Sequence, residues 1–205
     1  LIAIAVVSPW TIRNYAVFGR FIPLTTMGGS VLLQGNNDIV ASDPDLYGYN
    51  VWDTLIPGCA PLLRAPDNEI QRDRVAQHLA VEWIKGHPEK WLYLAQAKLR
   101  RGFTPFLQPR VSIYYRLVYA AIWGSVLLFF LLGFVPSLVS SLKQGSPSWL
   151  NHLAILHFVV LTVVFFGFAR YRYSVEPLCL MIAVWTASSI WNWWRGSNSR
   201  IPSQA

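Results

Sequence analysis

Three long apolar stretches, at residues 117–139, 150–169 and 175–194, constrain the fold most strongly. The first contains no charged residue. The second contains two histidines and no Asp, Glu, Lys or Arg, and the third contains one carboxylate, Glu176. A helix needs about 20 predominantly apolar residues to cross the hydrocarbon core of a bilayer. Each stretch therefore predicts a transmembrane helix.

The apolar run at residues 1–7 is too short to span a membrane and lacks the basic region of a signal peptide. The sequence also begins at Leu1, without a methionine and inside this run. These features predict that residues 1–9 are the end of a truncated transmembrane helix.

The composition favours a membrane protein as well. Hydrophobic residues make up 54% of the chain and charged residues 13%, whereas soluble domains carry about 25% charged residues. The net charge is +7, and residues 116–205 contain six basic residues against the single acid Glu176. This excess lies beside apolar segments rather than on one basic face, which favours membrane lipid over nucleic acid as a partner.

Residues 10–115 form a polar domain with a mixed helix and loop character. Its first half is rich in Gly, Pro, Asn and Asp, which predicts extended segments and turns. The sequence Asp67-Asn68-Glu69 predicts a helix start, Gly86 its end and Pro88 the start of another helix. That second helix has an apolar stripe followed by Arg100-Arg101, so it either lies on the membrane surface or packs on its own domain.

Taken together, these segments predict a mainly α fold, namely a polytopic α-helical membrane protein. A mixed helix and loop domain at residues 10–115 precedes three transmembrane helices and a short tail within residues 116–205.

The strongest site candidate is Arg170-Tyr171-Arg172 with Glu176 just beyond it. Two arginines at a helix boundary can hold a phosphate through charge-assisted hydrogen bonds. The alternative is that both side chains merely extend to the membrane interface. Glu176 opens an apolar segment, so its carboxylate must be paired or hydrated, and Arg170 or Arg172 is the nearest partner.

Arg13 and Asn14 form a second candidate because they follow the first apolar run, where a lipid headgroup or a phosphate could lie. An interfacial anchor is the alternative. Gly28-Gly29 and Gly35-Asn36-Asn37 predict a loop whose asparagine amides bind sugar hydroxyls, or else a plain tight turn.

Metal and nucleotide patterns are weak in this sequence. Asp43-Pro44-Asp45 matches an Asp-x-Asp pattern, but it is also common turn chemistry. His78 and Glu82 stand four residues apart on an expected helix with no third ligand in view. We therefore expect no metal site in this chain.

The order of motifs resembles that of a known family of membrane enzymes. Residues 8–37, SPWTIRNYAVFGRFIPLTTMGGSVLLQGNN, resemble the segment after a mid-protein transmembrane helix in bacterial GT-C superfamily glycosyltransferases, in particular family 39-like enzymes. Residues 169–184, ARYRYSVEPLCLMIAV, resemble the late motif of the same family, and residues 82–101 match moderately.

This resemblance implies that the chain is the C-terminal part of an enzyme that transfers a sugar from a polyprenyl phosphate to a lipid, glycan or protein acceptor. It implies a multi-pass protein of the bacterial inner membrane with a periplasmic polar domain, although basic residues beside the helix ends slightly favour the cytoplasm. The resemblance also assigns donor-phosphate binding and its support to specific residues: Arg170, Arg172 and Arg13, with Asn14, Asn36, Asn37, Glu176 and Tyr171.

The catalytic acid of this family would precede Leu1, in the missing N-terminal part of the same protein. The chain alone is therefore expected to be inactive and to bind no cofactor, while the whole enzyme could use a divalent metal. A non-catalytic membrane scaffold and a lipid-linked-sugar transporter are the alternatives, and a transporter should show broken spans and repeat symmetry.

Overall fold

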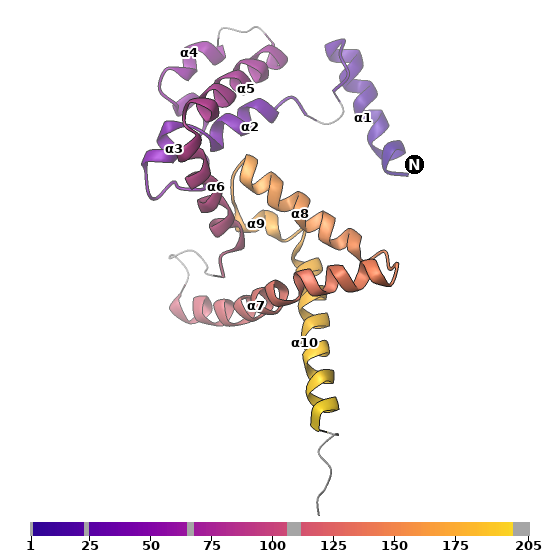
Figure 1. Ribbon diagram of the computed structural model, residues 1–205. Helices are drawn as coiled ribbons and strands as arrows, with labels where there is room; N and C mark the ends of the chain where they lie inside the picture. Colours follow the sequence, from indigo (N-terminus) through magenta and orange to yellow (C-terminus); the bar gives the residue numbers. More distant parts are fainter. Residues whose placement is uncertain (1, 23–24, 65–67, 106–111, 199–205) are drawn as a thin grey trace, which may run out of the picture. The chain divides into compact units, whose positions relative to one another are not determined.

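The computed structural model describes residues 2–22, 25–64, 68–105 and 112–198, and within these ranges the regular structure is helical, without strands (Figure 1). This agrees with the mainly α fold expected from the sequence. The elements in chain order are α1 (Ile2–Phe18), α2 (Gly28–Gly35), α3 (Asp38–Ser42), the 3₁₀ turn η1 (Asp53–Leu55), α4 (Cys59–Arg64), α5 (Glu69–Gly86), α6 (Pro88–Phe103), α7 (Ile113–Lys143), α8 (Trp149–Val164), α9 (Ala169–Arg172) and α10 (Glu176–Asn198).

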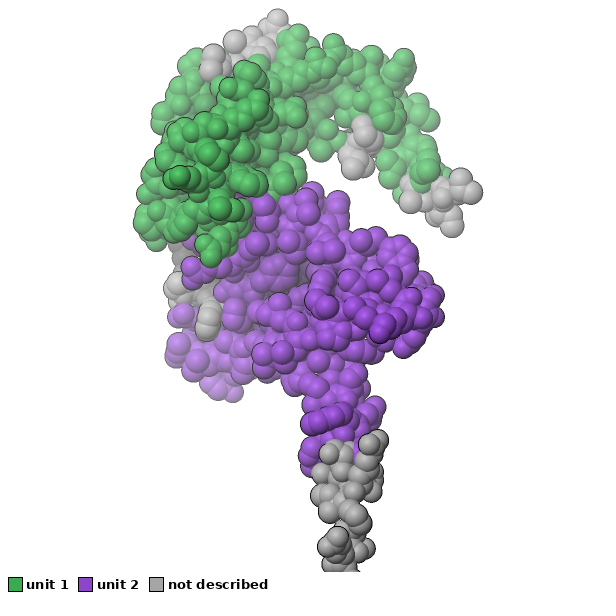
Figure 2. Space-filling model, viewed as in Figure 1, with its two compact units in different colours: residues 1–97, 164–166 green, residues 98–163, 167–205 purple. Residues whose placement is uncertain are grey.

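The chain forms two compact units, which Figure 2 colours separately. Unit 1 comprises Leu1–Ala97 with Val164–Phe166, and unit 2 comprises Lys98–Val163 with Gly167–Ala205.

Unit 1 is built on the packing of α2 against α5. Leu33 on α2 and Ala76 and Ala80 on α5 are almost completely buried between them. The helices approach so closely at Gly29 that an added Cβ atom would lie 2.0 Å from the backbone oxygen of Asp73. Only glycine fits this contact.

The prediction that Gly28-Gly29 lie in a loop was wrong, because both residues open α2. Glycine disfavours a helix by about 1 kcal/mol relative to alanine, but here the close contact with α5 outweighs that preference. The short helices α3 and α4 likewise replace part of the extended and turn structure expected in this half of the domain.

The boundaries of α5 and α6 confirm the sequence prediction. Asn68 caps α5, and its side-chain oxygen accepts a hydrogen bond from the backbone N–H of Gln71 at 2.9 Å. Helix α5 ends at Gly86 and α6 begins at Pro88. Asp67, the first residue of the predicted cap, lies outside the described residues.

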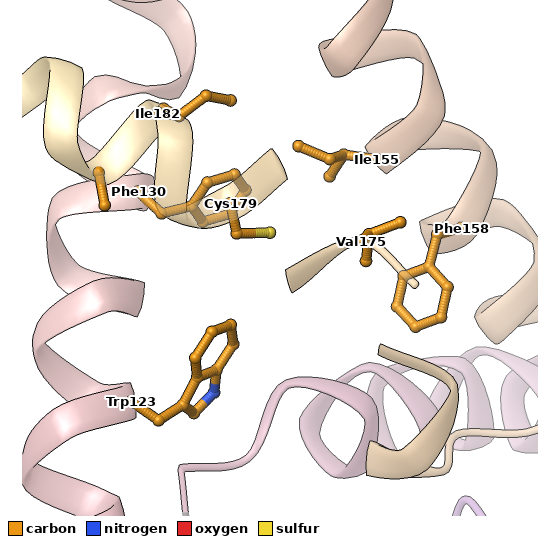
Figure 3. Packing of buried hydrophobic residues seen from close by; sticks show 8 residues of the cluster. Trp123, Phe130, Ile155, Phe158, Val175, Cys179 and Ile182 are labelled. Carbon is orange, nitrogen blue, oxygen red and sulfur yellow. The ribbon is translucent and has the colours of Figure 1, made fainter. Parts of the chain in front are cut away.

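The core of unit 2 joins α7, α8 and α10 (Figure 3). Each helix contributes large side chains to a shared apolar cluster, and Val175 contributes from the residue just before α10. The other labelled members of the cluster are Trp123 and Phe130 from α7, Ile155 and Phe158 from α8, and Cys179 and Ile182 from α10.

Helix α7, with 31 residues, is the one helix in the described part of the chain that is long and apolar enough to cross a membrane. It contains the predicted span at residues 117–139. Helix α8 is apolar but has only 16 residues. It ends at Val164, so the expectation that it would extend to residue 169 was wrong.

The chain leaves the helical path after Val164, and at Gly167 its backbone lies close to that of Lys98. A Cβ atom on Gly167 would lie 2.0 Å from the backbone oxygen of Lys98, and residues 166–168 carry no helix. Helix α10 begins at Glu176 and contains nearly all of the third predicted span. It has 23 residues, but its composition is not apolar enough to identify it as a membrane-crossing helix.

Substitution of Gly133 tests the contact between α7 and α10. A Cβ atom there would lie 1.6 Å from Oγ1 and 2.9 Å from Cβ of Thr186, whereas a Cβ atom on Gly124 of the same helix meets nothing within 4 Å. We expect Gly133→Ala to lower the free energy of unfolding by about 1–3 kcal/mol through overpacking. Gly124→Ala should leave it unchanged or raise it by up to about 1 kcal/mol.

Thermal unfolding in detergent, monitored by circular dichroism, would measure both variants. Equal effects of the two substitutions would contradict the close packing of α7 on α10 at Gly133.

Candidate functional site

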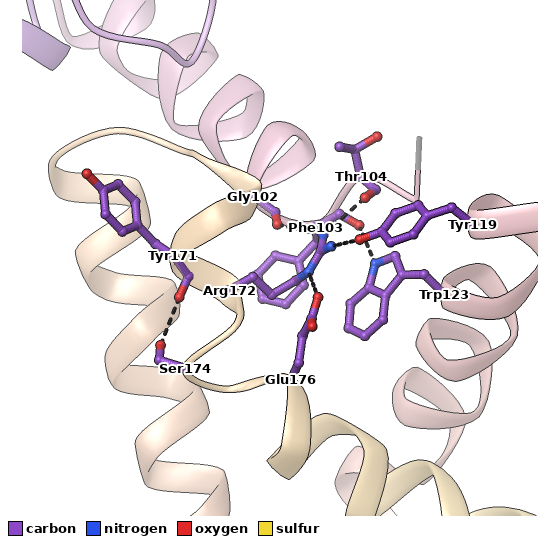
Figure 4. Close-up of polar contacts among 9 residues, drawn as sticks. All are labelled: Gly102, Phe103, Thr104, Tyr119, Trp123, Tyr171, Arg172, Ser174 and Glu176. Carbon is purple, nitrogen blue, oxygen red and sulfur yellow. Dashed lines mark hydrogen bonds and ion pairs between the residues drawn. The ribbon is translucent and has the colours of Figure 1, made fainter. Parts of the chain in front are cut away.

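The guanidinium of Arg172 is the centre of a polar cluster in unit 2 (Figure 4). The side chain has no solvent exposure. Nε donates to the Glu176 carboxylate at 2.8 Å, and Nη1 donates to the backbone oxygens of Gly102 and Thr104, each at 3.0 Å. Nη2 donates to the Tyr119 hydroxyl.

The partners of Arg172 come from several helices. Glu176 is the first residue of α10, and Arg172 is the last residue of α9. Gly102 lies in the last turn of α6, where carbonyl groups have no partner within the helix. A guanidinium at such a helix end satisfies these carbonyls and interacts favourably with the helix dipole.

An aromatic pair on α7 completes the cluster. The Arg172 guanidinium carbon lies 4.2 Å from the centre of the Trp123 ring, which is a cation–π distance. Trp123 itself donates from Nε1 to the backbone oxygen of Phe103 at 3.4 Å. Tyr119 and Trp123 stand four residues apart, so both face the arginine from one side of α7.

The arrangement confirms the predicted pairing of Glu176 with a neighbouring arginine. A guanidinium has five N–H groups. The Nε hydrogen, both Nη1 hydrogens and one Nη2 hydrogen of Arg172 donate in these contacts, so most of its donors are used. Arg172 therefore organises the junction of α6, α7, α9 and α10. Its predicted contact with a donor phosphate stays a prediction.

Arg170 and Tyr171 are exposed, unlike the buried Arg172. The Arg170 guanidinium carbon lies 4.9 Å from the Phe168 ring centre and 5.0 Å from the Tyr171 ring centre. Nη2 of Arg170 donates to the Tyr171 hydroxyl at 3.2 Å. Arg170 is thus held by aromatic side chains while its charge remains accessible.

Arg13 and Asn14 belong to unit 1, on α1. Arg13 is exposed and lies 5.4 Å from the Trp10 ring centre, and its Nη1 donates to the side-chain oxygen of Asn14 at 3.3 Å. Asn14 is buried, and its amide donates to the backbone oxygen of Ile22 at 3.0 Å. The predicted roles of this pair, phosphate contact or interfacial anchor, stay predictions.

Asn36 and Asn37 are buried in unit 1 and bind backbone rather than solvent. Asn36 donates to the backbone oxygens of Leu32 at 2.7 Å and Val164 at 2.9 Å. Asn37 caps α3 by accepting from the N–H of Val40 at 3.1 Å. The turn alternative accounts for both amides, and their predicted contact with sugar hydroxyls stays untested.

Sequence reasoning did not single out Tyr119, Trp123 or the backbone of Thr104 as partners of Arg172. The spacing of Tyr119 and Trp123 could have pointed to them, because residues four apart share one face of a helix. Both are aromatic residues with a polar group at the edge of the ring. The carbonyl contacts carry no sequence signal, because every residue supplies one.

Lys98 on α6 is a second buried basic side chain in unit 2, and sequence reasoning assigned it no role. Its side chain has no solvent exposure, and Nζ donates to the backbone oxygen of Val163 at 3.2 Å. Burial lowers the pKa of Lys98 to about 7, because desolvation disfavours its charged form.

No group of three or more His, Cys, Asp or Glu side chains that could hold a metal ion occurs among the described residues.

Comparison of the sequence and the structure with protein-family models, curated proteins and solved structures gives no match.

Substitution of Arg172 should destabilise the fold. Arg172→Ala leaves Glu176, the Tyr119 hydroxyl and buried carbonyls without their donor, so we expect a loss of about 3 kcal/mol in the free energy of unfolding. Arg172→Lys keeps the charge but lacks the planar fork of donors, and should recover only part of that loss.

Arg170→Ala is the matched control, because the side chain is exposed and should change stability by no more than about 0.5 kcal/mol. Denaturation in detergent would compare the three variants. If Arg172→Ala were as stable as Arg170→Ala, the buried network would not hold unit 2 together.

Lys98 should make the stability depend on pH. The pKa of Lys98 is about 7 in the folded chain against 10.5 for an ordinary lysine, so unfolding takes up a proton between these values. Raising the pH from about 7.5 to 9.5 should therefore stabilise the fold, by up to about 1.4 kcal/mol per pH unit. Chemical denaturation at several pH values would measure this slope.

Lys98→Met removes the titrating group, and the slope should fall by the same amount. An unchanged slope in this variant would mean that Lys98 is charged in the folded chain.

Proposed function

We propose that this chain is the C-terminal portion of an integral-membrane glycosyltransferase. The enzyme transfers a sugar from a polyprenyl-phosphate donor to a lipid, glycan or protein acceptor. The observation that carries the proposal is the pair of neighbouring arginines on α9, one exposed and one buried, directly before α10.

The apolar character of α7 supports the membrane part of the proposal. Many of its large side chains point outward and are more than half exposed, which is typical of a helix that faces lipid. Examples are Leu117, Ile122, Leu131 and Val135. Exposed tryptophans near the end of α10 fit a membrane interface, where aromatic rings with a polar edge collect.

The exposed arginine supports the phosphate part. Arg170 can present a guanidinium to a lipid-linked phosphate, and its stacking on Phe168 and Tyr171 reduces the side-chain freedom that binding would otherwise remove. Arg172 cannot reach a ligand without leaving its internal partners. We therefore assign the phosphate contact to Arg170 and the positioning of α9 to Arg172.

In the proposed reaction the bond between the sugar and the phosphate breaks, and negative charge develops on the leaving polyprenyl phosphate. A fixed guanidinium beside this phosphate stabilises the charge and lowers the barrier. The acceptor hydroxyl also needs a general base, and we assign that role to none of the residues described here. The chain by itself is expected to bind donor without transferring sugar.

We further propose that the protein lies in the bacterial inner membrane with several spans and that residues 10–115 face the periplasm. The arginines of α9 would then lie at the periplasmic side, where a polyprenyl-linked sugar presents its phosphate to an enzyme of this type.

Donor binding by the chain itself tests the role of Arg170. The chain would be reconstituted in nanodiscs of zwitterionic lipid that contain a polyprenyl phosphate, and binding would be measured by native mass spectrometry. We expect Arg170→Ala to weaken binding at least about tenfold, the loss expected for one charge-assisted hydrogen bond, without a change in thermal stability.

Arg195→Ala is the matched control. Arg195 is also exposed and stacked on an aromatic ring, with 4.8 Å to the Trp191 ring centre, but it lies in the last turn of α10. Equal loss in both variants would indicate general attraction to an anionic lipid. No loss in either variant would favour the non-catalytic scaffold over the transferase.

A further inference from the structure

Unit 1 contains a cleft of about 430 Å³ that the proposed function does not use. It lies beside the packed pair α2 and α5 and is bordered by η1 and the end of α4. Most of the lining side chains are polar or charged: Thr26, Ser30, Asp53, Thr54, Arg64, Glu69, Arg72 and Asp73, with Met27 and Leu63 as the apolar members.

Hydrogen bonds within unit 1 fix two of the carboxylates in this lining. Oδ1 of Asp73 accepts from the backbone N–H groups of Gly29 at 2.7 Å and Ser30 at 3.1 Å. Oδ2 of Asp53 accepts from the Ser30 hydroxyl at 2.6 Å. The second oxygen of each carboxylate accepts no hydrogen bond from the described residues, so each remains an oriented acceptor for a ligand.

The same contacts argue against an anionic ligand. The first N–H groups of α2 would attract an anion, but the Asp73 carboxylate already occupies them. The formal charge of the lining is negative, since Asp53, Glu69 and Asp73 outnumber Arg64 and Arg72. A metal ion is also disfavoured, because the described residues hold no set of three ligands that could bind one.

A ligand with several hydroxyl groups matches this lining. Each hydroxyl can donate to a carboxylate and accept from a guanidinium or a side-chain hydroxyl. Met27 is exposed in this lining and offers an apolar surface to the C–H groups of a sugar ring. The cleft volume lies within the range of about 300–1,000 Å³ that is usual for small-molecule sites.

We propose that this cleft binds a neutral saccharide through Asp53, Asp73 and Arg72. The inference goes beyond the proposed function, because a scaffold could bind a saccharide here as well as a transferase. The shared chemistry is the sugar ring, whether it is free in solution or carried by a lipid.

The experiment uses the full 205-residue chain in a detergent without a sugar headgroup, so that the detergent does not compete for the cleft. Free methyl hexosides would be tested by saturation-transfer difference NMR, and the same hexoses on diacylglycerol would be tested in nanodiscs. A saturation-transfer signal on the methyl hexosides shows that the chain binds them and supports a soluble source of the saccharide. Binding of only the lipid-borne sugar supports a glycolipid.

Arg72→Gln and Arg74→Gln provide the matched comparison, because both arginines are exposed on α5 but only Arg72 lines the cleft. We expect Arg72→Gln to weaken saccharide binding at least about tenfold through loss of a charged donor. Arg74→Gln should leave binding unchanged, and thermal unfolding should be the same for both.

Several outcomes would overturn the proposal. These are binding of neither form of the sugar, equal weakening by the two variants, or tighter binding of inorganic phosphate than of any hexoside. If the unsubstituted chain bound polyprenyl phosphate but no saccharide, this inference alone would be refuted, since the donor assay reports on Arg170 in unit 2.

Discussion

The burial of the Arg172 guanidinium is the constraint on which unit 2 depends. An unpaired charge away from water would cost many kcal/mol, so the chain has to bring hydrogen-bond acceptors together around this guanidinium. The partners lie in separate helices: the carbonyl of Gly102, the carboxylate of Glu176 and the hydroxyl of Tyr119. Because each partner restricts a different helix, one side chain defines where α6, α7 and α10 meet.

In a bilayer this polar junction would contribute a larger share of the free energy that holds the helices together. Apolar side chains gain little from leaving lipid for a protein interior, so helix association there rests on close packing and on polar contacts. Unit 2 has both: Gly133 lets α7 approach α10, and the Arg172 cluster joins the ends of α6 and α10.

The sequence allowed good predictions where the signal is local. The cap at Asn68, the break between Gly86 and Pro88 and the pairing of Glu176 with an adjacent arginine all follow from residues close together in the chain. The predictions were wrong where a distant contact decides the conformation. Gly28 and Gly29 open a helix in which Gly29 packs closely on α5, and α8 ends before Gly167, whose backbone lies close to that of Lys98.

The close fit of α2 on α5 has a consequence for kinetics. The carboxylate of Asp73 and the hydroxyl of Ser30 are held by the packing of the helices themselves, so their orientation does not await a ligand. A saccharide would lose its own freedom on binding but would order little of the protein. We expect association at the ordinary diffusional rate, with differences in affinity among saccharides expressed mainly as differences in residence time.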